Sequence, residues 1–139
     1  MRTFFDTNVL VYVFDRDSPG RSRRAHELMR EHVASGGLLL STQVLQEFYV
    51  AVTRKLARPL SQETALGALR QLASLPTVQV DSRLVLEAAS RSRELQLSFW
   101  DALIIQAAVE GGASHLLSED LQHGRRIDGL TIQNPFRTP

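Results

Sequence analysis

The apolar segments of this chain are short, and stretches with helical periodicity separate them. The runs typical of buried strands lie at residues 3–5, 38–40, 78–80, 115–117 and 131–133. Parallel strands need long crossover connections, usually helices, so this alternation indicates a parallel sheet covered on both faces. The pattern therefore predicts an α/β fold: a three-layer α/β/α domain with a short-stranded, mainly parallel central sheet.

The segments between those strands predict helices. Pro19-Gly20 is interpreted as a break in the chain, and Gly111-Gly112 as the end of the last helix. Ser41 or Thr42, and later Ser98, are suited to cap helix N-termini, because their hydroxyls accept hydrogen bonds from free backbone N–H groups. The expected helices, the first of them a short helix or turn, cover residues 7–14, 21–33, 42–57, 61–74, 82–95 and 98–110.

Length and composition exclude several classes of protein. The chain has 139 residues and fits a single domain over residues 1–139. It contains no Cys, which excludes disulfides, zinc–thiolate sites and cysteine nucleophiles and suits a cytoplasmic protein. The run Val9–Phe14 is too short to span a membrane, and its acidic neighbours do not fit a signal peptide. All basic residues except Lys55 are Arg, which suits phosphate contacts but follows equally well from genome composition.

Two acidic residues follow apolar strands. In FFDTNVLVY, Asp6 comes directly after the strand at 3–5, and its ordinary role is the N-cap of the next helix. Asp120 ends the Ser118-Glu119-Asp120 segment after the strand at 115–117, where adjacent acids also suit a polar loop. The carboxyl ends of parallel strands meet at one edge of the sheet, where open α/β sheets bind ligands. Taken alone, each acid fits either a structural or a functional role.

Two further acids lie on expected helices. Glu47 is about 60° from Val44 on the helical wheel, on the shoulder of the buried stripe, and a solvated side chain is its ordinary interpretation. Asp101 lies in SFWDALIIQAAVEGG, a helix that is apolar all round and therefore buried. A buried carboxylate needs partners, which favours a functional role, although Asp101 also suits the first turn of a helix capped by Ser98.

Considered together, these acids favour a metal site. Carboxylates that converge on one sheet edge repel one another, and a divalent cation removes that conflict. The four His residues are scattered, so the ligands are oxygens, which indicates Mg²⁺ or Mn²⁺ rather than Zn²⁺. Such a site supports hydrolysis of a phosphodiester without a covalent nucleophile.

The order and spacing of the motifs resemble the PIN-domain family. Its successive motifs are matched by FFDTNVLVY, by STQVLQEFY, by SFWDALI and by LLSED, and the resemblance runs from the first residue to near the last. Within the family, the chain is most similar to VapC-type toxins of type II toxin–antitoxin modules. The resemblance implies four acids of the site, Asp6, Glu47, Asp101 and Asp120, and two supporting residues, Asn8 and Ser118. Glu119 falls at a variable position and receives no ligand role.

The resemblance also implies an activity and partners. Such proteins are Mg²⁺-dependent endoribonucleases, with Mn²⁺ expected to substitute, and they form homodimers that an antitoxin inhibits by covering the active site. We expect RNA contacts from Arg21, Arg23, Arg24 and Arg54, although a solvated basic face explains each of them equally well.

Three alternatives differ from a toxin. A housekeeping RNA-processing nuclease of the same fold fits the same motifs. A phosphatase with an aspartyl-phosphate intermediate usually has a second Asp where Asn8 stands and a Lys near the phosphate, whereas Lys55 is expected in a helix, poorly placed for that role. A binding module with relic acids is disfavoured because all four acidic positions are intact.

Overall fold

A computed structural model describes residues 1–137 of the chain. Within these residues, six strands form one sheet with the order β3-β2-β1-β4-β6-β5. All neighbouring strands pair in parallel except β5 and β6, which are antiparallel. The strands are β1 (Arg2–Phe5), β2 (Leu38–Ser41), β3 (Thr77–Val78), β4 (Ala113–Leu117), β5 (Arg126–Ile127) and β6 (Leu130–Gln133).

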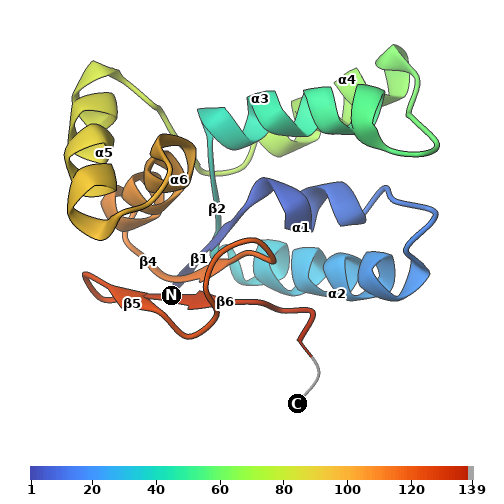
Figure 1. The fold of residues 1–139 in the computed structure, drawn as a ribbon. Coiled ribbons are helices and arrows are strands. Elements are labelled where there is room, and N and C mark those ends of the chain that lie inside the picture. The colour runs from blue at the N-terminus through green and yellow to red at the C-terminus, as the bar shows by residue number, and fades with distance from the viewer. Residues whose placement is uncertain (138–139) are drawn as a thin grey trace.

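Helices cover both faces of this sheet. Figure 1 shows α5 and α6 on one side of the strands and α1 to α4 on the other. The helical segments are α1 (Thr7–Tyr12), α2 (Pro19–Ser35), α3 (Thr42–Val50), the π-helix η1 (Ala51–Lys55), α4 (Gln62–Ala73), α5 (Ser82–Leu95) and α6 (Phe99–Glu110). The predicted three-layer α/β/α fold with a mainly parallel sheet is confirmed. Among the described residues, no helix has both the length and the apolar character that a membrane crossing requires.

The structure differs from the sequence-based expectations at four places. Pro19-Gly20 begins α2 instead of breaking the chain, because Pro is favoured at the first position of a helix. The expected strand at 78–80 is only Thr77–Val78. The helix expected to reach residue 57 changes to a π-helix after Val50. The unexpected strand β5 is only two residues long and is joined to β6 by Asp128-Gly129, both with positive φ, a pairing typical of tight hairpins.

The register of the central strands places two loop starts side by side. Phe5, the last residue of β1, pairs with Leu117, the last residue of β4, so Asp6 and Ser118 follow at the same edge of the sheet. Asp6 N–H also donates to the Leu117 carbonyl oxygen at 3.0 Å. β2 lies on the other side of β1 and continues into α3, which carries Glu47. Residues more than a hundred positions apart are thus fixed within contact of one another.

The core fixes the helices that carry the other acids. In α6, residues 102 to 108 are all buried, which confirms that this helix is apolar nearly all round. In α3 and η1, Val44, Phe48 and Val52 form the buried stripe, and Glu47 lies half-buried on its shoulder as expected. Both acidic residues therefore lie on helices whose rotation about their own axes is set by packing.

Candidate active site

Asp6 is the most deeply enclosed acid of the candidate site. It caps α1 by accepting a hydrogen bond from Thr7 N–H at 2.7 Å, and its other oxygen accepts one from Ser118 Oγ at 2.7 Å. Burial raises the pKa of Asp6 to about 6, with a further contribution from the charges of Glu47 and Asp120, although the two hydrogen bonds act in the opposite direction. Capping and a functional role are therefore compatible in one residue.

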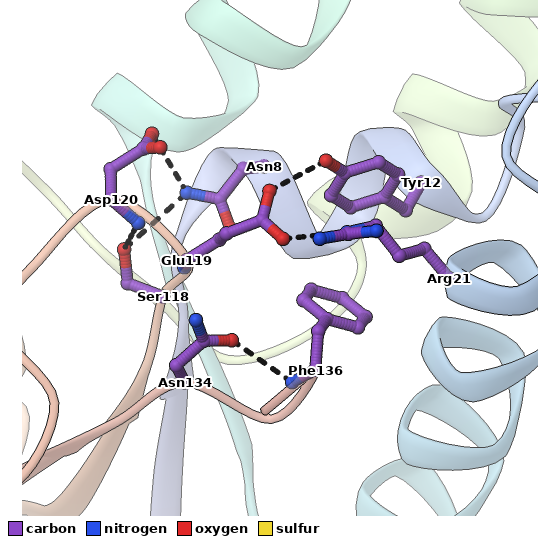
Figure 2. Close-up of polar contacts among 8 residues, drawn as sticks. All are labelled: Asn8, Tyr12, Arg21, Ser118, Glu119, Asp120, Asn134 and Phe136. Atoms are coloured by element: carbon purple, nitrogen blue, oxygen red, sulfur yellow. Dashed lines mark hydrogen bonds and ion pairs between the residues drawn. The ribbon is translucent and has the colours of Figure 1, made fainter. Parts of the chain in front are cut away.

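Asn8 connects the two loops of the site (Figure 2). Its Nδ2 donates to Asp120 Oδ2 at 3.0 Å and to Ser118 Oγ at 3.3 Å, and its Oδ1 accepts from Glu119 N–H at 3.1 Å. Ser118 Oγ also accepts from Asp120 N–H at 3.1 Å. The amide orientation is thus determined at both ends, and Asp120 is held beside Asp6. The two residues that the resemblance names as supporting, Asn8 and Ser118, are in contact with both acids.

Glu47 reaches the same region from α3. Thr7 Oγ1 donates to Glu47 Oε1 at 2.7 Å, and Gln43 Nε2 donates to Glu47 Oε2 at 3.3 Å. Gln43 Nε2 also donates to the Trp100 carbonyl oxygen of α6 at 3.3 Å. Gln43 was not among the residues predicted from the sequence, although its spacing of four residues from Glu47 places both on one helix face. Gln43 Oε1 is buried and has no hydrogen-bond partner among the described residues.

Asp101 is less firmly joined to the site than expected. Its backbone N–H donates to Ser98 Oγ at 3.1 Å, so Asp101 occupies the first turn of α6 beneath a Ser cap. Within residues 1–137, no hydrogen bond or ion pair joins the Asp101 carboxylate to the other acids or to the residues that hold them. Asp101 is connected to the site through its neighbour Trp100, whose carbonyl oxygen accepts a hydrogen bond from Gln43. The helix is buried, but Asp101 itself is half-exposed.

Glu119 points away from Asp120 and toward Tyr12 and Arg21, as Figure 2 shows. Its carboxylate accepts hydrogen bonds from Tyr12 Oη and from Arg21 Nε, each at 2.6 Å. The Arg21 guanidinium lies over the rings of Tyr12 and Phe136. Partial burial works to raise the pKa of Glu119, but the Tyr12 and Arg21 hydrogen bonds outweigh it and lower that pKa. Burial, together with the Glu119 contact, raises the pKa of Tyr12 to about 12.

The four arginines expected to contact RNA have different surroundings. Arg21 is paired with Glu119, and Arg24 contacts Glu27 and the Pro135 carbonyl oxygen. Arg23 and Arg54 are exposed and form no ion pair with another described residue. The structure therefore leaves the charges of Arg23 and Arg54 more available than those of the other two.

A cleft of about 600 Å³ opens beside these residues, between α1 on one side and α3 with η1 on the other. Thr7, Asn8 and Tyr12 line one wall, and Glu47 lines the other. Asp120 lies at the end of the cleft where the loop after β4 meets α1. A ligand in the cleft would thus meet two of the four acids directly, with Asp6 behind them.

The donor chemistry of the site fits a hard divalent cation. Asp6, Glu47 and Asp120 supply oxygens, and the raised pKa of Asp6 reflects, after its burial, the unneutralised charges of the other two. The fit is not complete as the side chains stand, because no group of three or more His, Cys, Asp or Glu in the described residues is arranged closely enough to hold one ion. Glu47 contacts Thr7 and Gln43 in this arrangement.

A comparison with protein families matches residues 3–129 to the PIN domain. The chain belongs to the PIN-domain family. The match covers the sheet edge and all four acidic positions, so the resemblance inferred from the motifs is confirmed at the level of the family. A comparison with curated proteins finds no match.

Several solved structures share this architecture. A toxin–antitoxin complex from Klebsiella pneumoniae is 17% identical over 98% of this chain and 99% of that one, with a TM-score of 0.69. VapBC2 from Rickettsia felis, bound to a DNA fragment from its promoter, is 20% identical over 96% and 98%, with a TM-score of 0.65. VapC20 from Mycobacterium tuberculosis, described as a toxin that cleaves the sarcin–ricin loop, is 19% identical over 82% and 86%, with a TM-score of 0.60. At these identities the likeness establishes the fold.

Proposed function

We propose that this PIN domain is a Mg²⁺-dependent endoribonuclease and the toxin of a type II toxin–antitoxin pair. The observation that carries the proposal is the network in which Asn8 and Ser118 hold Asp6 and Asp120 together at the end of a cleft that Glu47 also lines. The similarity to solved toxins of toxin–antitoxin systems supports the biological role.

In this proposal Asp6, Glu47, Asp101 and Asp120 hold the metal ion, with Mn²⁺ able to replace Mg²⁺. A bound divalent ion supplies hydroxide near neutral pH and offsets the negative charge of the phosphate. The protein contributes the orientation of its own groups: Ser118 directs Asp6, Asn8 directs Asp120, and Gln43 directs Glu47. The unpartnered Gln43 Oε1 adds a buried acceptor beside Glu47, suited to a water within the site.

The substrate in this proposal is RNA, and exposed arginines contribute to its binding. Arg23 and Arg54 are the better candidates, because Arg21 and Arg24 are already engaged with acidic side chains. We further propose that a cognate antitoxin inhibits the enzyme by covering the cleft, and that the chain forms a homodimer. An antitoxin that presents a cation to the acids would compete with the metal for the same negative field.

The test of the activity uses purified chain and a fluorescent single-stranded RNA. Cleavage is expected with Mg²⁺ or Mn²⁺ and is expected to stop on addition of EDTA. Asp6→Asn should abolish it, whereas Glu63→Gln, which removes one negative charge from the exposed first turn of α4, should not. EDTA-insensitive cleavage, or equal cleavage by the Asp6 variant, would contradict the site.

The test of the biological role is growth on induction in a bacterial host. The parent chain alone should arrest growth, the Asp6 variant should not, and co-expression of an adjacent small reading frame should restore growth and yield a complex. Normal growth despite soluble, RNA-cleaving protein would retain the nuclease and favour the second candidate, a housekeeping RNA-processing enzyme of the same fold.

A further inference from the structure

Lys55, the only lysine of the chain, lies on the wall of the cleft. The sequence predicts Lys55 in a helix, and the structure places it in the last turn of the helical segment η1. Glu47, Ala51 and Lys55 follow one another at intervals of four residues, and all three line the cleft. Residues four apart share one face of a helix, so the face that presents Glu47 also presents Lys55.

The π-helix η1 keeps this face directed toward the cleft. Leu56 N–H donates to the Ala51 carbonyl oxygen at 3.2 Å, a bond between residues five apart, and Thr53 Oγ1 donates back to the Tyr49 carbonyl oxygen at 2.7 Å. Such a wider turn aligns residues five apart, and Val50 and Lys55 indeed both line the cleft. π-turns are rare and occur frequently at functional sites. Arg54 has the same charge but does not line the cleft.

The charges of the cleft make Lys55 distinctive. Glu47, Asp120 and Asp15 also line it, and Lys55 is the one cationic side chain among the described residues that do so. Its ammonium forms no ion pair within residues 1–137, so its charge is available to a ligand. An RNA strand that brings its cleaved phosphate to the acids must keep its other phosphates near a negative site, and a cation in the same cleft offsets that repulsion.

We propose that Lys55 forms a subsite for one backbone phosphate of the RNA, next to but distinct from the cleaved one. Lys55 lies eight residues after Glu47 on one continuous helical segment, about two turns further along it. This separation suits contact with a phosphate that neighbours the reacting one better than contact with the reacting phosphate itself. This subsite rests on the proposed ribonuclease activity and adds to it the path of the substrate, along the groove between α1 and η1.

A contact to a remote phosphate has a specific kinetic signature. It binds the ground state and the transition state equally, so its loss raises KM and leaves kcat unchanged. Lys55→Met should raise KM about fivefold or more, the scale of one charge-assisted contact in a water-accessible cleft. The slope of log(kcat/KM) against log[salt] should become shallower by about 0.7, as expected for one lost phosphate contact on a single strand.

The experiment compares the parent with Lys55→Met, Lys55→Arg and Arg70→Gln on a set of RNAs shortened from either end. Arg70→Gln is the matched control, because it removes one exposed cation from the last turn of α4, away from the cleft. Lys55→Arg should restore most of the affinity. The penalty of Lys55→Met should disappear for RNAs too short to reach from the acids to Lys55.

Several results would overturn the subsite. One is an unchanged KM and salt slope in Lys55→Met; another is an equal effect of Arg70→Gln, or a loss confined to kcat for every length of RNA. Unchanged RNA kinetics with weaker inhibition by an antitoxin would assign Lys55 to a protein partner instead. If the parent cleaves no RNA, the proposed function fails, and anisotropy of the labelled RNA in EDTA still decides the subsite: Lys55→Met must bind more weakly than Arg70→Gln.

Discussion

The candidate site has two sides that differ in how firmly the chain itself holds them. The ordered side consists of Asp6, Asn8, Ser118 and Asp120, whose polar groups are joined by a continuous set of hydrogen bonds. The open side consists of Glu47 and Asp101. Glu47 has one short hydrogen bond, from Thr7, and one longer bond from Gln43, and within the described residues the Asp101 carboxylate is not joined to the other acids.

The difference follows from which elements carry the residues. The ordered side comes from the N-terminus of α1, which follows β1, and from the loop after β4, and the register of these adjacent strands fixes Asp6 and Ser118 beside each other. The open side comes from α3 and α6, which belong to opposite layers and are joined by the hydrogen bond from Gln43 to the Trp100 carbonyl oxygen. The chain thus orders half of its site in advance, and we expect a ligand, not the fold, to order the other half.

The largest expected effect is the loss of RNA cleavage on substitution of the acids, and it should be similar for the two sides of the site. Asp6→Asn, Glu47→Gln, Asp101→Asn and Asp120→Asn should each reduce RNA cleavage by about a hundredfold or more, because loss of a metal ligand exceeds the cost typical of its supporting residues. Initial rates on one RNA at saturating Mg²⁺ measure this, with circular dichroism to confirm folding. Near-parental cleavage by the Asp101 variant would show that α6 contributes no ligand, and the site would then consist of Asp6, Glu47 and Asp120.

The ordered side should give the metal-free stability a pH-dependent component, which comes from Asp6. The pKa of Asp6 is about 6 when folded and 3.8 otherwise, so the folded state binds this proton more tightly. Its contribution to stability is complete below pH 3.8 and is lost as the pH rises through 6. At about 1.4 kcal/mol per pKa unit, the loss is roughly 3 kcal/mol.

Urea unfolding in EDTA between pH 4 and pH 8 measures that dependence. Asp6→Asn should remove this component and make the metal-free protein more stable than the parent at neutral pH. Asp101→Asn is the matched control from the open side and should still show the component that comes from Asp6. If the free energy of unfolding depended on pH in the same way in the parent and in the Asp6 variant, the pKa of Asp6 would not be raised in the folded state.

Metal binding should reveal the open side. Mn²⁺ at about 100 times its dissociation constant should stabilise the folded parent by roughly 2.7 kcal/mol, because only the folded state binds it. Asp101→Asn should lose most of that gain although its metal-free stability is unchanged. Differential scanning fluorimetry over a Mn²⁺ series measures both quantities. A full Mn²⁺ shift in the Asp101 variant would contradict a ligand role on α6.

The smallest expected effect concerns the support behind the ordered side. Glu119→Gln weakens the contacts of this side chain with Tyr12 and Arg21. Because these contacts are partly exposed, the free energy of unfolding should fall by only about 1 kcal/mol. Cleavage should fall by less than about tenfold, because Glu119 holds the loop through its side chain and contacts none of the other acids. Glu27→Gln, which affects an exposed pair with Arg24, is the control and should change neither quantity.

The sequence predicted the ordered side better than the open one for a physical reason. Asp6 and Asp120 follow apolar strands, and the ends of adjacent parallel strands must meet, so the pattern alone brings them together. Asp101 was expected to be buried among partners because its helix is apolar all round. Asp101 lies in the first turn, however, where its side chain is only partly covered by other residues. A helical wheel does not show which other elements pack against each turn of the helix.

Side-chain contacts between residues far apart in the chain could not be predicted from the sequence. Arg21 and Glu119 are 98 positions apart, and nothing in either segment indicates their contact. Lys55 lies eight residues after Glu47, so a common helix face could have been inferred from the sequence. That this face lines a cleft depends on how α1 packs against α3, which the sequence does not show. The strand β5 was missed because two residues give no periodicity.

The two edges of the sheet have a consequence for how this domain meets other chains. Each edge strand, β3 and β5, is two residues long. Unpaired backbone groups at a sheet edge are templates for strands of other molecules, and very short edge strands are a common protection against that templating. A neighbouring strand would find too short a ladder at either edge for lasting attachment. Association of folded copies must therefore use side-chain surfaces of the helical layers, and edge-to-edge aggregation should require prior unfolding.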